Sequence, residues 1–263
     1  MITGMGADGR CRVPARPCIM WSYSGKGFSM TTQQFFVELD RRIAQYDLLC
    51  HPFYKAWAAG ELTREELSDY GRQYYAHVAA FPTYLAERGI RLDDGELRQA
   101  VLANLCDEKG GEDAFGQPEP AHSELWLDFV EGMSGSRSLK QHELVSEVKD
   151  LVRHFSWVAR EGSPEEALAA FYAYESQVPR VAQEKARGLR ETYGADEKTC
   201  RYFILHTTAD VYHSQIWRKQ LEKCLEKNPQ AAEAALNAGE AAAKALWKAL
   251  DGIEERRLAK AAA

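Results

Sequence analysis

The sequence predicts an all-α, single-domain bundle of seven or eight helices. Apolar residues recur at helical spacing through most of the chain after residue 30. Several of these segments open with a Ser or Thr that is followed three residues later by Glu or Gln, the pattern of a helix-capping box. No convincing alternation of apolar and polar residues indicates a strand. Helices patterned in this way favour helix-on-helix packing around one core.

The first three predicted helices are separated by short breaks. The segments 31–49 and 62–89 each begin with a capping box, and Pro82 predicts a kink in the second of them. The helix predicted over 93–111 has one apolar face and ends at two consecutive glycines. Residues 110–121 are predicted to be a loop because their composition is typical of one.

The remaining five predicted helices fill the second half of the chain. Two of them cover 122–133 and 139–160. A longer one, over 163–194, opens with a Ser cap, a Pro at the first helical position and a Glu that completes the box. It is followed by a helix over 196–227 and by an Ala-rich helix over 229–250.

The two ends of the chain are expected to lie outside the folded domain. We predict a disordered extension over 1–30, a domain over 31–252 and a flexible tail over 253–263. The extension contains several Gly and Pro residues and no clear periodicity. It also lacks a continuous apolar stretch, so it is not typical of a secretory signal.

Composition argues against several classes of function. A formal net charge of −6 disfavours a general binder of nucleic-acid phosphates, which would need a basic stripe. No run of about 18 apolar residues could span a membrane. Six cysteines without a CxxC pair match neither a disulfide framework nor a zinc knuckle. We therefore expect a cytoplasmic protein with no nucleic-acid or membrane partner.

The segment HTTADVYHSQIW, residues 206–217, places three polar side chains on one helix face. His206, Asp210 and His213 are separated by steps that return to nearly the same side of an α-helix. Apolar residues flank them, and burying a neutral polar group without a partner costs roughly 2 to 7 kcal/mol. A bound metal would offset this cost. The alternative is a hydrogen-bond network on a partly solvated face.

Other segments offer further carboxylates and another imidazole. Glu175 lies in the aromatic segment FYAYESQVP, where a lone acid tends to be neutral or paired. The segment NLCDEKGG ends a predicted helix with Asp107 and Glu108, and the next predicted helix opens with His122. Oxygen and nitrogen ligands on four helices, without a thiolate, suit two iron or manganese ions better than structural zinc. For Glu108, a solvated helix terminus is the alternative.

Four segments resemble a known family. They are HPFYKAWAAGELTREELSDYGRQYYAHVAAFPTYL, NLCDEKGG, YESQVPRVAQEKARGL and HTTADVYHSQIW. They are similar to the para-aminobenzoate synthases related to the chlamydial protein that associates with death domains. These belong to the heme-oxygenase-like dimetal oxidases, a superfamily that shares its fold with pyrroloquinoline-quinone synthase and thiaminase-like proteins. The resemblance covers roughly residues 33–250 and implies a heme-oxygenase-like bundle.

The resemblance implies a centre of two metal ions, Fe/Fe or Mn/Fe, with six ligands. Carried over residue by residue, the ligands fall on Glu108, His122, Glu175, His206, Asp210 and His213. The loop between the first two is longer here than in the chlamydial relative. Glu112 or Glu124 could therefore take the place of one of them.

The resemblance also implies a reaction, the formation of para-aminobenzoate for folate biosynthesis. In such relatives the ring is attributed to a tyrosine of the protein itself and the amino group to a lysine, with O2 and a reductant as co-substrates. These residues fall on Tyr54 and Lys185. Tyr70 and Tyr174 match other aromatic positions that could pass or compete for a radical. From the residues alone, the alternatives are core tyrosines with hydrogen-bonded hydroxyls and a solvated helix lysine.

Other functions stay open at this point. The same centre could act on an external small amine or acid, or the chain could be a metal-free oxidase like pyrroloquinoline-quinone synthase. A third alternative is a non-catalytic interaction scaffold, which would be expected to lack the six ligands. We expect an enzyme that takes electrons from an external reductant and can form a homodimer.

Overall fold

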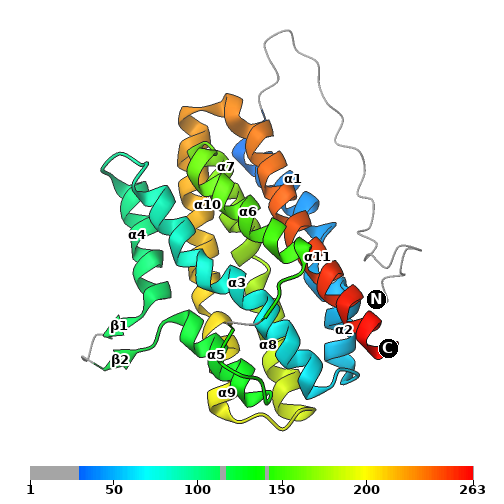
Figure 1. Ribbon diagram of the computed structural model, residues 1–263. Coiled ribbons are helices and arrows are strands. Elements are labelled where there is room, and N and C mark those ends of the chain that lie inside the picture. The colour runs from blue at the N-terminus through cyan, green and yellow to red at the C-terminus, as the bar shows by residue number, and fades with distance from the viewer. Residues whose placement is uncertain (1–29, 113–116, 140–141, 263) are drawn as a thin grey trace.

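The computed structural model describes residues 30–112, 117–139 and 142–262. These residues form helices packed side by side, with a small pair of strands projecting from one end (Figure 1). The prediction of an all-α bundle is confirmed. The disordered extension predicted over 1–30 lies outside the described residues, apart from Met30.

Eleven α-helices make up most of the described part of the chain. They are α1 (Thr32–Ala44), α2 (Pro52–Ala59), α3 (Arg64–Gly89), α4 (Glu96–Lys109), α5 (His122–Gly132), α6 (Ser146–Glu161), α7 (Pro164–Glu175), α8 (Val178–Glu191), α9 (Glu197–His206), α10 (Ala209–Lys227) and α11 (Ala232–Ala261). Two 3₁₀-helices, η1 (Leu48–Cys50) and η2 (Pro229–Ala231), and two antiparallel strands, β1 (Gly111–Glu112) and β2 (Pro118–Glu119), complete the described elements.

Local sequence signals account for the helix starts. Thr31, Thr63 and Ser163 cap α1, α3 and α7, and in each case the Gln or Glu three residues later completes the capping box. The helix α2, which was not predicted separately, starts at Pro52 behind His51. The His51 ring accepts a hydrogen bond from a backbone N–H of the first turn.

The structure has more helices than the seven or eight predicted, because α2 was not predicted and two long predicted helices are each divided. The segment 163–194 breaks after Glu175 into α7 and α8, and the segment 196–227 breaks after His206 into α9 and α10. At the second break, two threonine hydroxyls donate to backbone carbonyls three residues earlier. Ser and Thr side chains compete in this way with the helical backbone pattern. Both breaks fall directly after a predicted metal ligand.

The C-terminal end also differs from the prediction. The helix α11 continues to Ala261, and Ile253 is buried against the core. The flexible tail predicted over 253–263 is therefore wrong as far as Ala261. The apolar side chain of Ile253 extends the buried face of α11 beyond the predicted boundary.

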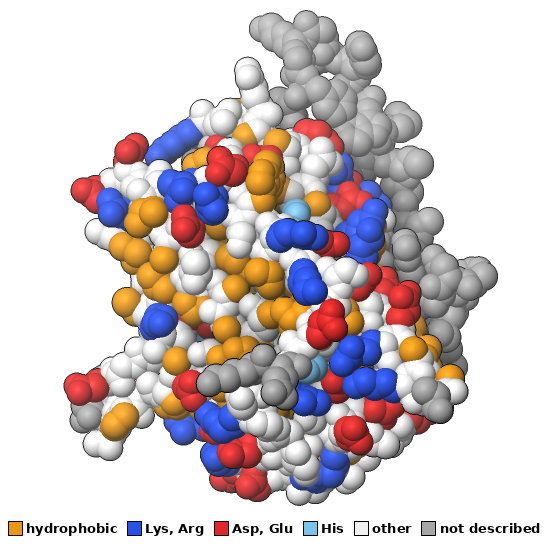
Figure 2. All heavy atoms as spheres, viewed as in Figure 1, with side chains coloured by type: hydrophobic (Ala, Val, Ile, Leu, Met, Phe, Trp, Pro, Cys, Tyr) orange, Lys and Arg blue, Asp and Glu red, His pale blue; other side chains and the backbone are white. Residues whose placement is uncertain are grey.

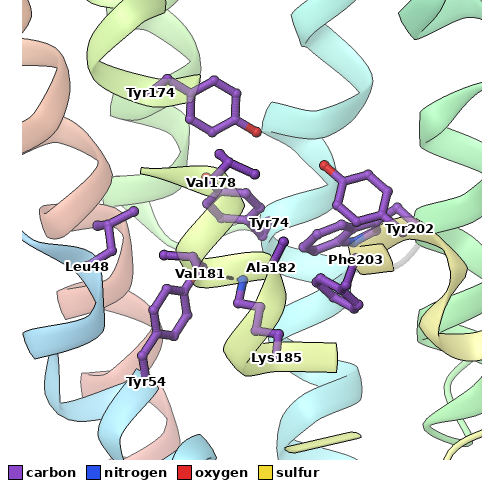
Figure 3. A pocket seen from close by; sticks show the side chains of 11 residues that line it. Leu48, Tyr54, Tyr74, Tyr174, Val178, Val181, Ala182, Lys185, Tyr202 and Phe203 are labelled. Carbon is purple, nitrogen blue, oxygen red and sulfur yellow. Dashed lines mark hydrogen bonds between the residues drawn. The ribbon is translucent and has the colours of Figure 1, made fainter. Parts of the chain in front are cut away.

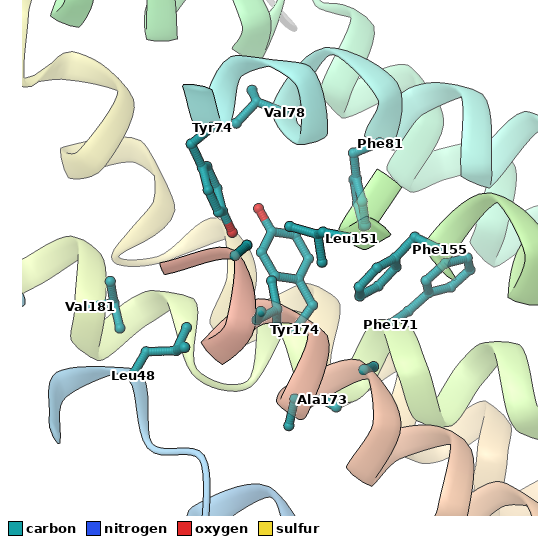
Figure 4. Close-up of a cluster of buried hydrophobic side chains, with 14 of the residues drawn as sticks. Leu48, Tyr74, Val78, Phe81, Leu151, Phe155, Phe171, Ala173, Tyr174 and Val181 are labelled. Carbon is teal, nitrogen blue, oxygen red and sulfur yellow. The ribbon is translucent and has the colours of Figure 1, made fainter. Parts of the chain in front are cut away.

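The helix α7 lies at the centre of the bundle. Every residue from Ala167 to Glu175 is buried, and α7 packs against α10 and α11. The helix α11 also contacts α1 and α6, while α3 contacts α4, α5 and α6. Around Tyr174 the core is aromatic, with Phe81 of α3 and Phe155 of α6 at ring-centroid distances of 5.1 and 6.1 Å (Figure 4).

Charges are mixed over the surface that Figure 2 shows, where Lys and Arg side chains alternate with Asp and Glu. Among the described residues, no helix combines the length and the apolarity needed to cross a membrane.

Candidate metal centre

Six acid and histidine side chains form two buried groups of three. One group is Glu108, His122 and His206, and the other is Glu175, Asp210 and His213. Within each group, one potential ligand atom per residue lies within 4.8 Å of the others. Each side chain belongs to a residue at most 5% exposed. The structure therefore brings together the six residues to which the resemblance assigned metal ligation.

The first group joins α4, α5 and α9. Nδ1 of His122, at the start of α5, lies 3.1 Å from Oε1 of Glu108, in the last turn of α4. The chain between them passes through β1 and β2, and Gly110, where α4 ends, has a positive φ of 67°. The ring of His206 lies 4.6 Å from that of His122, and its Nδ1 donates to the Tyr202 carbonyl at 2.6 Å. This bond leaves Nε2 of His206 free for a metal ion.

The second group joins α7 and α10. Asp210 and His213 lie on the first turns of α10, with Nδ1 of His213 3.3 Å from Oδ1 of Asp210. Glu175 is the last residue of α7. Its carboxylate accepts hydrogen bonds from Asn104 Nδ2 at 3.1 Å and from the indole N–H of Trp217. Both carboxylate oxygens of Glu175 are thereby held in place.

The charges of the two groups act on one another. Burial, with the negative charge of Asp210, raises the pKa of Glu175 well above its usual value. Burial opposes charge on Glu108 as well, but His122 and the other imidazoles lower the pKa of that carboxyl. Burial also opposes charge on His213, yet the surrounding carboxylates raise its pKa to about 9. The carboxylates of the two groups thus stabilise positive charge placed between them, such as that of a metal ion.

The donor set fits two divalent cations. Three carboxylates and three imidazoles are the ligands that iron and manganese accept in proteins. Among the described residues, the ion-pair partners of Glu108 and Asp210 are histidines rather than Lys or Arg. Nδ1 of His122 is buried without a hydrogen bond of normal geometry. A metal ion would satisfy such a nitrogen.

A second cluster surrounds Lys185 of α8. Its Nζ donates to the hydroxyl of Tyr54 at 2.8 Å and to that of Tyr70 at 2.6 Å, and the two hydroxyls are 2.9 Å apart. The same nitrogen lies 4.3 Å from the centroid of the Tyr54 ring. Burial lowers the pKa of Lys185 well below its ordinary value, so the neutral amine is favoured. The solvated helix lysine considered from the sequence is excluded, since the residue is 6% exposed.

A small cavity lies beside the lysine cluster, on the side that faces the metal-ligand groups. Its volume is about 30 Å³, room for about two water molecules. Tyr54 and Lys185 line one end, and Tyr174 and Tyr202 line the other, with their hydroxyls pointing toward one another (Figure 3). Tyr174 directly precedes the α7 carboxylate, and the Tyr202 ring stacks on His206 at 4.0 Å. The cavity therefore reaches from the lysine cluster to two tyrosines that adjoin metal-ligand residues.

Three residues of the site were missed from the sequence: Asn104, Tyr202 and Trp217. Each stands four residues from a predicted ligand on the same helix, a spacing that places both side chains on one face. That spacing could have identified them as neighbours of the ligands.

The two alternative ligands suggested by the longer loop lie elsewhere. Glu112 is exposed in β1. Glu124 is exposed on α5, where its carboxylate pairs with Arg137 at 2.7 Å. Neither belongs to the two groups of three.

A protein-family model described as an iron-containing redox enzyme matches residues 68–247. The chain belongs to this family. Membership of the iron-containing redox enzymes confirms the prediction of an oxidoreductase. Together with the two ligand groups, it indicates a metal-dependent enzyme.

Similar proteins extend the comparison over most of the chain. The 4-aminobenzoate synthase of Chlamydia muridarum is 40% identical over 194 residues, which cover 73% of this chain and 79% of the relative. The 4-aminobenzoate synthase of Nitrosomonas europaea is 38% identical over 237 residues, covering 86% and 93%. The resemblance seen in the sequence motifs is thereby confirmed.

Solved structures show the same fold at low sequence identity. A TenA homolog from Pseudomonas syringae pv. tomato matches with a TM-score of 0.68 at 14% identity, over 89% of this chain and 99% of that chain. A domain of unknown function with a heme oxygenase-like fold, from Shewanella denitrificans, also has a TM-score of 0.68, at 16% identity over 88% and 94%. The predicted heme-oxygenase-like fold is confirmed.

Proposed function

We propose that this protein forms 4-aminobenzoate (para-aminobenzoate), taking the ring from its own Tyr54 and the nitrogen from its own Lys185. Relatives named 4-aminobenzoate synthase support the product. The contact between Lys185 and Tyr54 is the observation that supports these two residues as the sources of the nitrogen and the ring. The amine lies within hydrogen-bond distance of the phenol oxygen that an amino group would replace.

The atoms of the product can be traced to these two side chains. The Cα–Cβ bond of Tyr54 breaks, and Cβ is oxidised to the carboxylate carbon. At the opposite end of the ring, a C–N bond to the lysine nitrogen replaces the C–O bond, whose oxygen leaves as water. The Cε–Nζ bond of Lys185 breaks and leaves Cε as an aldehyde, while the Cα of Tyr54 takes a hydrogen in place of Cβ, as in glycine. In sum, two O2, two electrons and two protons are consumed and two waters are released. Dioxygen is the oxidant, and an external reductant supplies the remaining electrons. Because both side chains are consumed, each protein chain yields about one product molecule.

Two metal ions, Fe/Fe or Mn/Fe, would be held by the two groups of three, with Glu108, His122 and His206 around one and Glu175, Asp210 and His213 around the other. When bound, they would supply the activation of dioxygen and one-electron transfer. Trp217 and Asn104 fix the Glu175 carboxylate, and the Tyr202 carbonyl fixes the His206 ring. These contacts hold the donor atoms in place before any metal ion binds.

The tyrosines between the two clusters have separate roles in this proposal. Tyr70 bridges Lys185 and Tyr54, so its hydroxyl orients the amine toward the ring. Tyr174 lies at the metal-facing end of the cavity, where its phenol can pass an electron toward the metal ligands. Tyr54 and Lys185, the two proposed donors, both line this cavity, which supports an internal substrate.

The test uses full-length protein labelled with ring-¹³C tyrosine or with ¹⁵N-ε lysine, loaded with Fe(II) and Mn(II) and exposed to O2 with a reductant. We expect the product to carry the ¹³C ring in the first sample and the ¹⁵N amino group in the second. The variants Tyr54→Phe and Lys185→Arg should abolish the product while they keep the bound metal. The exposed residues Tyr212 and Lys198 provide matched controls, Tyr212→Phe and Lys198→Arg, which should leave the yield unchanged.

Full yield from both site variants would overturn the internal origin of the product. Unlabelled product that depends on an added small amine or acid would instead identify an enzyme with an external substrate. Loss of product in Tyr70→Phe but not in Tyr54→Phe would assign the ring to Tyr70.

A further inference from the structure

Asp107 makes a contact with the metal-ligand groups that the proposed reaction does not use. Its Oδ2 lies 3.1 Å from Nε2 of His213. The Asp107 side chain is 55% exposed, whereas that of His213 is 3% exposed. Asp107 directly precedes Glu108 at the end of α4, yet the two carboxylates contact different imidazoles. Glu108 lies beside His122, whereas Asp107 lies beside His213.

The two nitrogens of His213 face in different directions. Nδ1 lies beside Asp210, a member of the second metal-ligand group, and Nε2 lies beside Asp107, which belongs to neither group. A histidine that binds a metal through one nitrogen commonly donates its other N–H to a carboxylate or a backbone carbonyl. That second bond fixes both the tautomer and the orientation of the ring. His206 already has such a bond, from Nδ1 to the Tyr202 carbonyl.

We propose that Asp107 is the positioning residue of His213, accepting a hydrogen bond from Nε2 so that Nδ1 is presented to the metal beside Asp210 and Glu175. Asp107 acts on the metal only through the imidazole. This inference rests on the metal centre of the proposed function. Two other roles are distinguishable by experiment: Asp107 as a direct metal ligand, and Asp107 as a surface ion pair without influence on the metal.

The chain offers a matched control for this contact. Asp251 of α11 pairs with Nε2 of the buried His51 at 3.0 Å, and its side chain is 45% exposed. This pair therefore has the same chemistry and a similar exposure to the Asp107–His213 pair. His51 belongs to neither group of potential ligands. Removing Asp251 tests the general effect of losing a carboxylate from a buried imidazole.

The experiment measures the dissociation constants of Mn(II) and Co(II) for metal-free, full-length protein, with the visible absorption of bound Co(II) as a second readout. The proteins are wild type, Asp107→Ala, Asp107→Asn and Asp251→Ala. We expect Asp107→Ala to weaken binding at one of the two sites about 10- to 100-fold, as loss of such a partner does elsewhere. Asp107→Asn should bind nearly as wild type, because its amide oxygen still accepts the N–H. Asp251→Ala should match wild type.

Equal affinities in Asp107→Ala and wild type would overturn the proposal and leave a surface ion pair. Equal losses in Asp107→Asn and Asp107→Ala would also overturn it, since an amide keeps the hydrogen bond but is a poor metal ligand, and Asp107 would then bind the metal directly. Wild-type protein that binds no metal would refute the proposed metal centre itself, an outcome distinct from the other two.

Discussion

At the scale of single residues, Lys185 has the most unusual environment of the site. Aromatic rings surround its ammonium position, and the rings of Trp57 and Phe203 lie 5.4 and 5.5 Å from Nζ. Its hydrogen-bond partners are two phenols, which do not compensate a positive charge as a carboxylate would. Burial therefore lowers the pKa of Lys185. An amine is nucleophilic only in its neutral form, so this burial prepares the lysine for the proposed transfer of nitrogen.

The lowered pKa of Lys185 predicts a particular dependence of stability on pH. Between this pKa and the value of about 10.4 for an unfolded lysine, the unfolded chain binds a proton that the folded chain does not. The free energy of unfolding of the wild type therefore rises with pH in this interval. In Lys185→Met this contribution is absent. We expect the variant to gain stability relative to wild type as pH falls from 10 toward 7, by about 1.4 kcal/mol per pH unit at most.

Urea denaturation of both proteins, followed by circular dichroism at several pH values, measures this difference. The contributions of the other titrating groups are the same in both proteins and cancel in the difference between their free energies of unfolding. A difference that stays constant between pH 7 and 10 would mean that Lys185 is charged in the folded protein.

At the scale of helices, the first metal-ligand group depends on how closely α5 and α9 approach. Gly132 ends α5 directly against Thr199, in the first turn of α9, and a Cβ at Gly132 would overlap the Thr199 side chain. Thr199 also donates to Asp196, which caps α9. The absence of a side chain at Gly132 thus allows the approach of the two helices that carry His122 and His206.

We expect Gly132→Ala to destabilise the protein by about 1–3 kcal/mol, the usual cost of overpacking. This outcome opposes helix propensity, which favours Ala over Gly by about 1 kcal/mol. Thr199→Ala in the same chain removes the two closest overlapping atoms, Oγ1 and Cγ2, so the double variant should be more stable than the sum of the two single effects. Urea denaturation of the wild type, the two single variants and the double variant gives the free energies for this double-mutant cycle. Strict additivity would show that the contact does not limit the approach of α5 and α9.

The helices also show how far the sequence predicts the structure. The capping boxes at Thr31, Thr63 and Ser163 are local signals and identify three helix starts. The breaks after Glu175 and His206 were missed, because each segment keeps its apolar periodicity across the break. Local signals of both breaks were nevertheless present. Pro179 lies in the first turn of α8, and the hydroxyls of Thr207 and Thr208 donate to backbone carbonyls at the second break.

The sequence identified most residues of the candidate site but not the contacts between them. The family motifs identified the six potential ligands, Tyr54 and Lys185, and the structure brings them into two clusters. Periodicity alone could not show that Tyr70 bridges Tyr54 and Lys185, since the three residues come from three helices. Nor could it show that Asp107 lies on His213, a contact between α4 and α10.

At the scale of the whole molecule, the proposed substrate is part of the hydrophobic core. Tyr54 is 5% exposed and packs edge-on against the rings of Trp57 and Tyr70. A protein that gives up this ring therefore loses core packing in the same event. Enzymes that act on bound ligands return to their starting stability after each turnover, whereas this chain would not.

We predict that protein recovered after the reaction is less stable than unreacted protein by about 3–5 kcal/mol, the usual cost of truncating a buried aromatic side chain. The loss of Cβ as well leaves a glycine-like residue inside α2, which adds a helix-propensity cost of about 1 kcal/mol. Urea denaturation before and after exposure to O2 and reductant measures the difference, with Tyr54→Gly as the mimic of the reacted chain. Tyr54→Phe treated in the same way should be unchanged, because its ring is retained. If product forms at about one molecule per chain while the unfolding curve stays the same, the side chain of Tyr54 is still in the core. The ring of the product then did not come from Tyr54.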